Sequence, residues 1–129
     1  MPVKILIVEE HKAVRNALRD WLKVEFPRDR LCEAVSGEQA ITIARRENPD
    51  LVVMDMCLSG MNGIEVARSI KTFRQYTKIV ILATHADKIY RDMAKEAGVN
   101  AYIPKREVLT ELIPTVVALL SNGTNRSSS

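Results

Sequence analysis

Several features that would place a chain in a specialised class are missing from this sequence. No uninterrupted apolar run approaches the roughly 20 residues that a membrane-spanning helix requires. The first residues, MPVKILIVEE, hold only a short apolar stretch that stops at two acids, which is unlike a secretory leader. No internal repeat is evident. We therefore expect a soluble, cytoplasmic protein with no membrane partner.

Cysteine is scarce, and basic residues are not concentrated in one tract. Cys32 and Cys57 are the only cysteines and lie far apart without metal-ligand spacing, which favours free, buried thiols in a reducing compartment. The net charge is +3, from 19 basic and 16 acidic residues spread along the chain. Such a mild and dispersed excess gives little support for direct nucleic-acid binding.

The sequence does contain enough apolar material for one hydrophobic core. With 129 residues and 47% hydrophobic composition, the chain is long enough for one domain and too short for two of ordinary size. We place this domain over residues 1–120. Residues 121–129 are polar and lack apolar periodicity, which is typical of a disordered tail or a linker stub.

Five short apolar runs alternate with five amphipathic segments. The runs are rich in Val, Ile and Leu and too short for helices, so they predict strands that are buried on both faces. They are Val3–Val8, Leu31–Val35, Leu51–Met54, Lys78–Ala83 and Ala101–Ile103. Helices are expected in a segment that ends before Pro27 and then over Gly37–Glu47, Gly63–Thr72, Asp87–Ala97 and Glu107–Leu120. This alternation predicts an α/β fold with a parallel sheet between layers of helices.

The helical spacing also predicts which side chains face the core. The residues expected to be buried in the first, fourth and fifth helices are Val14, Leu18, Trp21, Leu22, Ile89, Met93, Ala97, Leu109, Leu112, Val116 and Leu120. Pro114 lies inside the last helical pattern, and we expect it to kink or split that helix at Ile113.

Charged residues follow three of the predicted strands. Glu9 and Glu10 end the first strand, Asp55 ends the third, and Lys105 follows the fifth. In a sheet of this class, ligands bind outside the carboxyl ends of the strands, so these four side chains should gather at one edge. Any one of the acids alone is more simply explained as a helix cap or a solvated residue. The prediction depends on their combination.

Three neighbouring carboxylates repel one another unless a cation lies among them. Mg²⁺ prefers oxygen ligands and often brings a phosphate with it. A carboxylate beside such an ion is able to act as a nucleophile toward phosphorus. We therefore expect Asp55 to accept a phosphoryl group and Lys105 to pair with the charge that arrives.

At these positions the sequence resembles the receiver domain of bacterial two-component response regulators. The resemblance covers Val3 to Leu120 and rests on four segments in order, namely EEHKAVR, SGEQAI, DMCLSGMNG and EAGVNAYIPK. The first three are most similar to receivers that precede a helix-turn-helix output domain.

The resemblance implies a flavodoxin-like, doubly wound sheet of five parallel strands in the order 2-1-3-4-5, with five helices. It implies that a sensor histidine kinase or a phosphotransfer protein donates a phosphoryl group to Asp55. Mg²⁺ would be held by Glu9, Glu10, Asp55 and the Cys57 carbonyl. Apart from accepting the group and slowly releasing it, the domain would not be an enzyme.

The resemblance also implies how the signal leaves the site. A hydroxyl after the fourth strand and the aromatic Tyr102 would reorient and change the surface formed by the fourth helix, the fifth strand and the fifth helix. A homodimer through this surface or through the first helix is compatible with that role. Transcription would be regulated through an output domain absent from this chain, which would also make the only contact with DNA.

The sequence departs from the receiver pattern at four places. Glu10 stands where Asp is usual, Ser59 and Arg106 stand where Pro is common, and Ala83 occupies the place of the switch hydroxyl. Thr84 is one residue further on, and adjacent strand residues point to opposite faces. A second hypothesis is therefore a degenerate receiver that acts as an interaction module independently of phosphorylation.

Two enzyme-like alternatives with the same sheet have less support. A flavin or nucleotide site would need a Gly- or Ser/Thr-rich loop after the first strand, and here that loop is EEHK. An Asp-nucleophile phosphatase would need a second acid soon after Asp55. Met56, Cys57 and Leu58 supply none.

Overall fold

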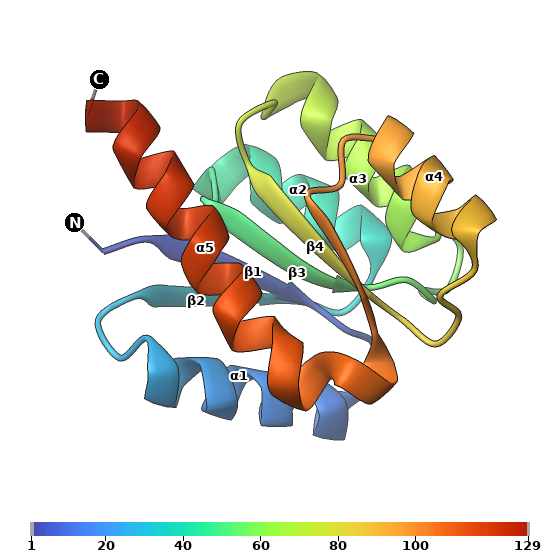
Figure 1. The fold of residues 1–129 in the computed structure, drawn as a ribbon, viewed down its shortest axis with the longest axis horizontal. Helices are drawn as coiled ribbons and strands as arrows, with labels where there is room; N and C mark the ends of the chain where they lie inside the picture. Colours follow the sequence, from blue (N-terminus) through green and yellow to red (C-terminus); the bar gives the residue numbers. More distant parts are fainter. Residues whose placement is uncertain (1, 129) are drawn as a thin grey trace.

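In the computed structural model, the backbone is described for residues 2–128 and the side chains for residues 2–121. Its strands are β1 (Lys4–Val8), β2 (Arg30–Ala34), β3 (Leu51–Asp55), β4 (Lys78–Ala83) and β5 (Ala101–Pro104). Its α-helices are α1 (Lys12–Glu25), α2 (Gly37–Glu47), α3 (Gly63–Phe73), α4 (Lys88–Glu96) and α5 (Val108–Ser128), and a 3-10 turn spans Lys105–Glu107. The strands form one parallel sheet in the order β2-β1-β3-β4-β5, which confirms the expected fold (Figure 1).

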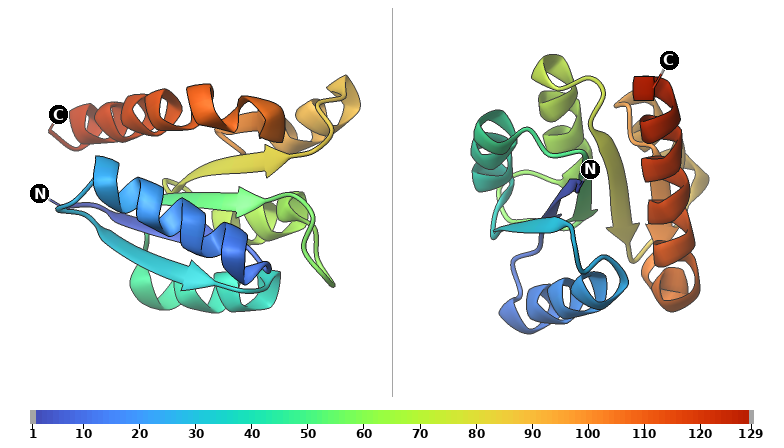
Figure 2. Two further views of the ribbon diagram at one scale, coloured as in Figure 1. Left: turned by 90° about the horizontal axis from the view of Figure 1, so that it is seen from below. Right: turned by 90° about the vertical axis from the view of Figure 1, so that its left-hand side faces the viewer.

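Helices cover both faces of the sheet (Figure 2). On one face, α1 and α5 contribute Leu18, Leu22, Leu112 and Val116 to a core with the odd-numbered residues of β1 and β3. On the other face, the core draws on α2, α3 and α4. The central strands β1, β3 and β4 are buried almost throughout, as expected for a parallel sheet with helices on both faces. β2 and β5 are the edge strands and are only partly buried, so the prediction of burial on both faces is wrong for both.

Local sequence signals set the helix boundaries close to the site. Ser36 begins α2 by accepting a hydrogen bond from the Gln39 N–H. Asn62 and Glu65 form a reciprocal capping box at the start of α3. After α4, Gly98 has a φ of 91°, a left-handed conformation that other residues rarely adopt.

Four of the apolar side chains expected in the core are exposed instead. Val14, Ile89, Met93 and Leu109 have relative exposures of 47%, 66%, 41% and 84%. Ala94 is the buried residue within α4, and of the three residues expected to face the core only Ala97, at the C-terminal cap, is buried. The buried face is therefore turned toward Ala94, the residue after Met93. The pattern identified the helix but not the face that it buries.

The last helix is longer and less interrupted than the sequence predicts. Pro114 lies within α5 and does not split it at Ile113. Leu112 and Val116 on either side are fully buried, so packing holds the helix together although proline lacks the N–H for one intrahelical bond. The backbone of 121–128 continues α5, and the end of the domain at residue 120 stays a prediction. In the described part of the chain, no helix has both the length and the apolar character to cross a membrane.

Candidate functional site

The side chains of Asp55 and Lys105 meet at the carboxyl edge of the sheet. Asp55 is the last residue of the buried central strand β3 and is 4% exposed. Lys105 follows β5, on the far side of β4, and its Nζ lies 2.9 Å from Asp55 Oδ1. The same oxygen accepts a hydrogen bond from the Cys57 N–H at 3.3 Å. The expected pairing of the acid with the lysine is therefore present.

Glu9 lies beside Asp55 at this edge. In the parallel register of β1 and β3, Val8 pairs with Met54, and Glu9 and Asp55 are the next residues of the two strands. Glu9 is 2% exposed, and its Oε2 accepts from the backbone N–H of His11 at 2.9 Å and lies 3.0 Å from His11 Nδ1. Two buried carboxylates thus occupy adjacent strand ends.

Glu10 is directed to the loop after β3. Its Oε1 accepts from the Ser59 N–H at 2.6 Å, and its Oε2 accepts from the Ser59 hydroxyl at 2.7 Å. Hydrogen bonding from the Ser59 side chain and backbone lowers the pKa of the Glu10 carboxyl. This loop is closed at its end by the Gly63 N–H, which donates to the Met56 carbonyl at 2.8 Å.

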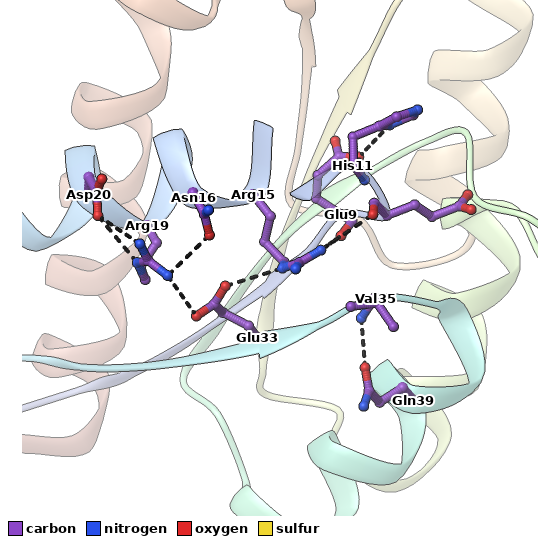
Figure 3. Close-up of polar contacts among 10 residues, drawn as sticks. Glu9, His11, Arg15, Asn16, Arg19, Asp20, Glu33, Val35 and Gln39 are labelled. Atoms are coloured by element: carbon purple, nitrogen blue, oxygen red, sulfur yellow. Dashed lines mark hydrogen bonds and ion pairs between the residues drawn. The ribbon is translucent and has the colours of Figure 1, made fainter. Parts of the chain in front are cut away.

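Arg15 fixes the backbone of the acidic loop, a role that the motif EEHKAVR did not reveal. Its guanidinium donates to the carbonyls of Glu9 and Glu10 at 3.0 and 3.3 Å. It also pairs with Glu33 of β2, which in turn lies 3.5 Å from Arg19 (Figure 3). The position of Arg15 in the sequence indicates this role, since a basic side chain one turn into a helix is able to reach the loop that precedes the helix.

A magnesium ion fits part of this arrangement. Glu9 and Asp55 supply the buried carboxylates that Mg²⁺ prefers. In this conformation the Glu10 carboxylate is directed to Ser59, which donates to each of its oxygens, so its orientation is set by Ser59 and not by a metal ion. Accordingly, the residues described contain no group of three or more His, Cys, Asp or Glu side chains placed to hold a metal ion.

The residues expected to transmit the signal lie at the end of β4, in the loop that follows it and in β5. Ala83 is buried at 1% exposure, whereas Thr84 is exposed. The Tyr102 hydroxyl donates to the His85 carbonyl at 2.8 Å, and Arg91 lies 5.6 Å from the centre of the Tyr102 ring. Tyr102 is therefore tied to the loop after β4, and burial raises the pKa of its phenol.

Three further residues bear on the sequence expectations. The Cys57 thiol is exposed, so the expectation of buried thiols is wrong for it; Cys57 lies in the loop after β3 rather than in the strand. Cys32 is partly buried, and burial raises the pKa of its thiol. Arg106 follows Lys105 within the 3-10 turn, and no peptide bond in the described residues is cis.

Comparison with known proteins gives a consistent assignment. The family model described as the response regulator receiver domain matches residues 5–117. The response regulator protein VraR of Staphylococcus saprophyticus is 30% identical over 124 residues, which are 95% of this chain and 58% of that protein. The response regulator MprA of Mycolicibacterium vanbaalenii is 32% identical over 129 residues, covering 96% of this chain and 53% of the relative. This chain thus spans about half the length of these curated relatives.

Solved structures agree with the sequence matches. A two-component response regulator of the LuxR family from Aurantimonas sp. SI85-9A1 superposes with a TM-score of 0.88 at 30% identity, covering 95% of this chain and 87% of that one. The response regulator TrrA of Thermotoga maritima, solved in complex with Mg²⁺ and BeF, gives 0.80 at 28% identity, covering 92% and 99%. The chain belongs to the response regulator receiver domain family of bacterial two-component systems.

Proposed function

We propose that this domain accepts a phosphoryl group on Asp55 from a sensor histidine kinase or a phosphotransfer protein. The observation that carries the proposal is the contact at the carboxyl edge of the sheet, where a carboxylate only 4% exposed lies 2.9 Å from the Lys105 ammonium group. The acid lies at the end of a fully buried strand and the cation comes from a distant part of the chain. Solvation alone does not account for that placement.

The contacts of Asp55 assign different roles to its two oxygens. Oδ1 is held by Lys105 and by the Cys57 N–H, so we expect Oδ2 to form the bond to phosphorus while the bond from phosphorus to the donor nitrogen breaks. The Lys105 side chain is 43% exposed, which leaves it free to pair with the arriving negative charge. Mg²⁺ bound by Glu9 and Asp55 would neutralise part of the charge on the phosphoryl oxygens.

The consequence of phosphorylation would be a change in a protein-protein surface. Tyr102 connects β5 to the loop between β4 and α4 through its bond to the His85 carbonyl. In this proposal, a change at the Asp55 edge would reach α4 by way of Tyr102. The relatives named above are about twice as long as this chain, which supports a further, output domain in the whole protein. Regulation of transcription through that domain and a cytoplasmic location belong to the same proposal, because they are what the receiver family implies.

Mass spectrometry after incubation with acetyl phosphate and Mg²⁺ tests the acceptor. The native chain should gain the mass of one phosphoryl group, and Asp55→Asn should gain none. Asp92→Asn is a matched control, because Asp92 is an exposed acid of α4, and it should be modified like the native chain. A native chain without the adduct, or an adduct that persists in Asp55→Asn, would contradict the proposal.

A second candidate function is an interaction module that works without phosphorylation. It is favoured by the buried Ala83, which has no hydroxyl to bind a phosphoryl oxygen, and by Thr84, which is exposed. Beryllofluoride with Mg²⁺ separates the two candidates. A switching receiver should show amide NMR shifts at Asp55 and also at Tyr102 and α4, whereas shifts confined to the Asp55 loop, or no shifts, would support the module.

A further inference from the structure

Two departures from the receiver pattern meet in one contact. Glu10 stands where Asp is usual and Ser59 where Pro is usual, and they are 49 residues apart in sequence. Both oxygens of the Glu10 carboxylate are engaged, one by the Ser59 N–H at 2.6 Å and one by its hydroxyl at 2.7 Å. Proline has neither donor, and an aspartate is one methylene shorter. The contact therefore requires both unusual residues, Glu10 for its length and Ser59 for its two donors.

The backbone on both sides of the Glu10–Ser59 contact is held in place, so the side chain of Glu10 is the part that is able to change its direction. Arg15 holds the carbonyls of both Glu9 and Glu10, so the acidic loop is fixed from below. The loop that carries Ser59 turns sharply at Gly60, whose φ is 83°. With both backbones set in this way, the direction of the Glu10 carboxylate depends on the rotamer of its side chain, which in this structure ends at Ser59.

We propose that Ser59 is a positioning residue that holds Glu10 out of the metal site, so that Mg²⁺ binds fully only when the Glu10–Ser59 contact opens. This inference rests on the proposed function, because it concerns the metal that assists phosphorylation of Asp55. A ligand that requires a minor conformation binds more weakly by the fraction of molecules in that conformation. The contact thus lowers the apparent affinity for Mg²⁺ without removing any residue of the site.

A purely structural role for the contact predicts the opposite result. If Ser59 only supports the loop, breaking the contact loosens the site and weakens Mg²⁺ binding or leaves it unchanged. If Ser59 withholds Glu10, breaking the contact tightens binding, and the gain depends on the Glu10 carboxylate. Measuring the variants singly and together separates these two roles.

The experiment is a titration with Mg²⁺ alone, followed by the backbone amide signals of residues 55–58. Ser59→Pro, which removes both donors, should lower the dissociation constant for Mg²⁺ by about tenfold, and Ser59→Ala, which keeps the N–H, by about threefold. Glu10→Asp should also tighten binding, because the shorter side chain falls short of Ser59. In Glu10→Ala/Ser59→Pro the gain should vanish. Ser69→Ala in α3 is the matched control and should bind like the native chain.

Several outcomes would contradict the proposed role of Ser59. A dissociation constant in Ser59→Pro equal to or above the native value, or a gain that persists in the double variant, would remove the inference. If Ser59→Pro proves unfolded by circular dichroism, Ser59→Ala and Glu10→Asp decide the question in the same way. Phosphorylation of the native chain on Asp55 together with unchanged Mg²⁺ affinity in the variants would leave the proposed function intact and reject the inference alone. No phosphorylation and no Mg²⁺ response in any variant would reject both.

Discussion

The ion pair of the site has a natural comparison elsewhere in the molecule. Lys105 Nζ lies 2.9 Å from Asp55, and Lys88 Nζ lies 2.8 Å from Asp92. The separations are nearly equal, but the side-chain exposures are not, at 43% and 4% for the first pair and 89% and 60% for the second. Burial alone should therefore decide how strongly each pair couples.

The expected magnitudes follow from these environments. The exposed pair, spaced i,i+4 on α4, should couple by about 0.3–0.5 kcal/mol. A hydrogen bond to a buried charge contributes about 1.5–3 kcal/mol. Because Lys105 is nearly half exposed, solvent screening reduces that figure, and we expect about 1–1.5 kcal/mol for its coupling to Asp55.

Two double-mutant cycles measured by urea unfolding test this expectation. One cycle uses Asp55→Asn and Lys105→Met, and the other uses Asp92→Asn and Lys88→Met. Lys105→Met alone should lower the free energy of unfolding, because it leaves a buried carboxylate without its cation, and should cost little once Asp55→Asn is present. Coupling energies that agree within about 0.3 kcal/mol between the two cycles would refute the argument that burial sets the strength of this contact.

Three further changes test other parts of the structure. Pro114→Ala should raise the free energy of unfolding by about 2 kcal/mol. Proline in a helix interior costs about 3 kcal/mol, and about 0.4–1 kcal/mol of this is offset because proline restricts the unfolded chain. A gain under about 0.5 kcal/mol in urea unfolding would contradict this expectation. Gly63→Ala should destabilise the fold by about 1–3 kcal/mol in the same assay, because its Cβ would lie 3.1 Å from the Met56 Cα. Hydrogen bonding from Lys4 lowers the pKa of Glu47 from its ordinary 4.5, so its stabilising effect is present above that pH and is lost as the pH falls through the lower folded-state value. Glu47→Gln should accordingly destabilise the protein at pH 7, and this effect should shrink as the pH is lowered below 4.5; an effect that does not shrink would reject the assignment.

The strands and most helix boundaries could be predicted because each carries a local signal. The predicted strand Lys78–Ala83 and helix Gly37–Glu47 agree with the observed bounds at both ends. Their ends coincide with changes in apolar content or with a capping residue such as Ser36. The buried face of α4 could not be predicted in this way. Its contact with the sheet uses the small residue Ala94, which periodicity gives less weight than Ile89 or Met93.

In the site, too, some features could be predicted from the sequence and others could not. The meeting of Asp55 with Lys105 follows from topology, because parallel strands deliver their carboxyl ends to one edge. The direction of the Glu10 side chain does not, since it is a rotamer chosen by a partner from another loop. The sequence does show that position 59 is not proline and therefore has a backbone N–H donor. It does not show that this donor binds Glu10.

The departures from the receiver pattern have different physical consequences, and this separates acceptance of the phosphoryl group from transmission of the signal. Glu10 and Ser59 are joined in a direct contact, and in our proposal opening that contact would bring the Glu10 carboxylate to the metal site. Ala83 has no such remedy, because its methyl group is buried and the neighbouring Thr84 is exposed. The pair of Asp55 and Lys105 on which the proposed acceptor chemistry rests is present, and the proposed adjustment of metal affinity concerns one other side chain. Under the proposed function, transmission would depend on groups other than a buried hydroxyl at the end of β4. Tyr102, which is bonded to the His85 carbonyl, is the residue we propose for that connection.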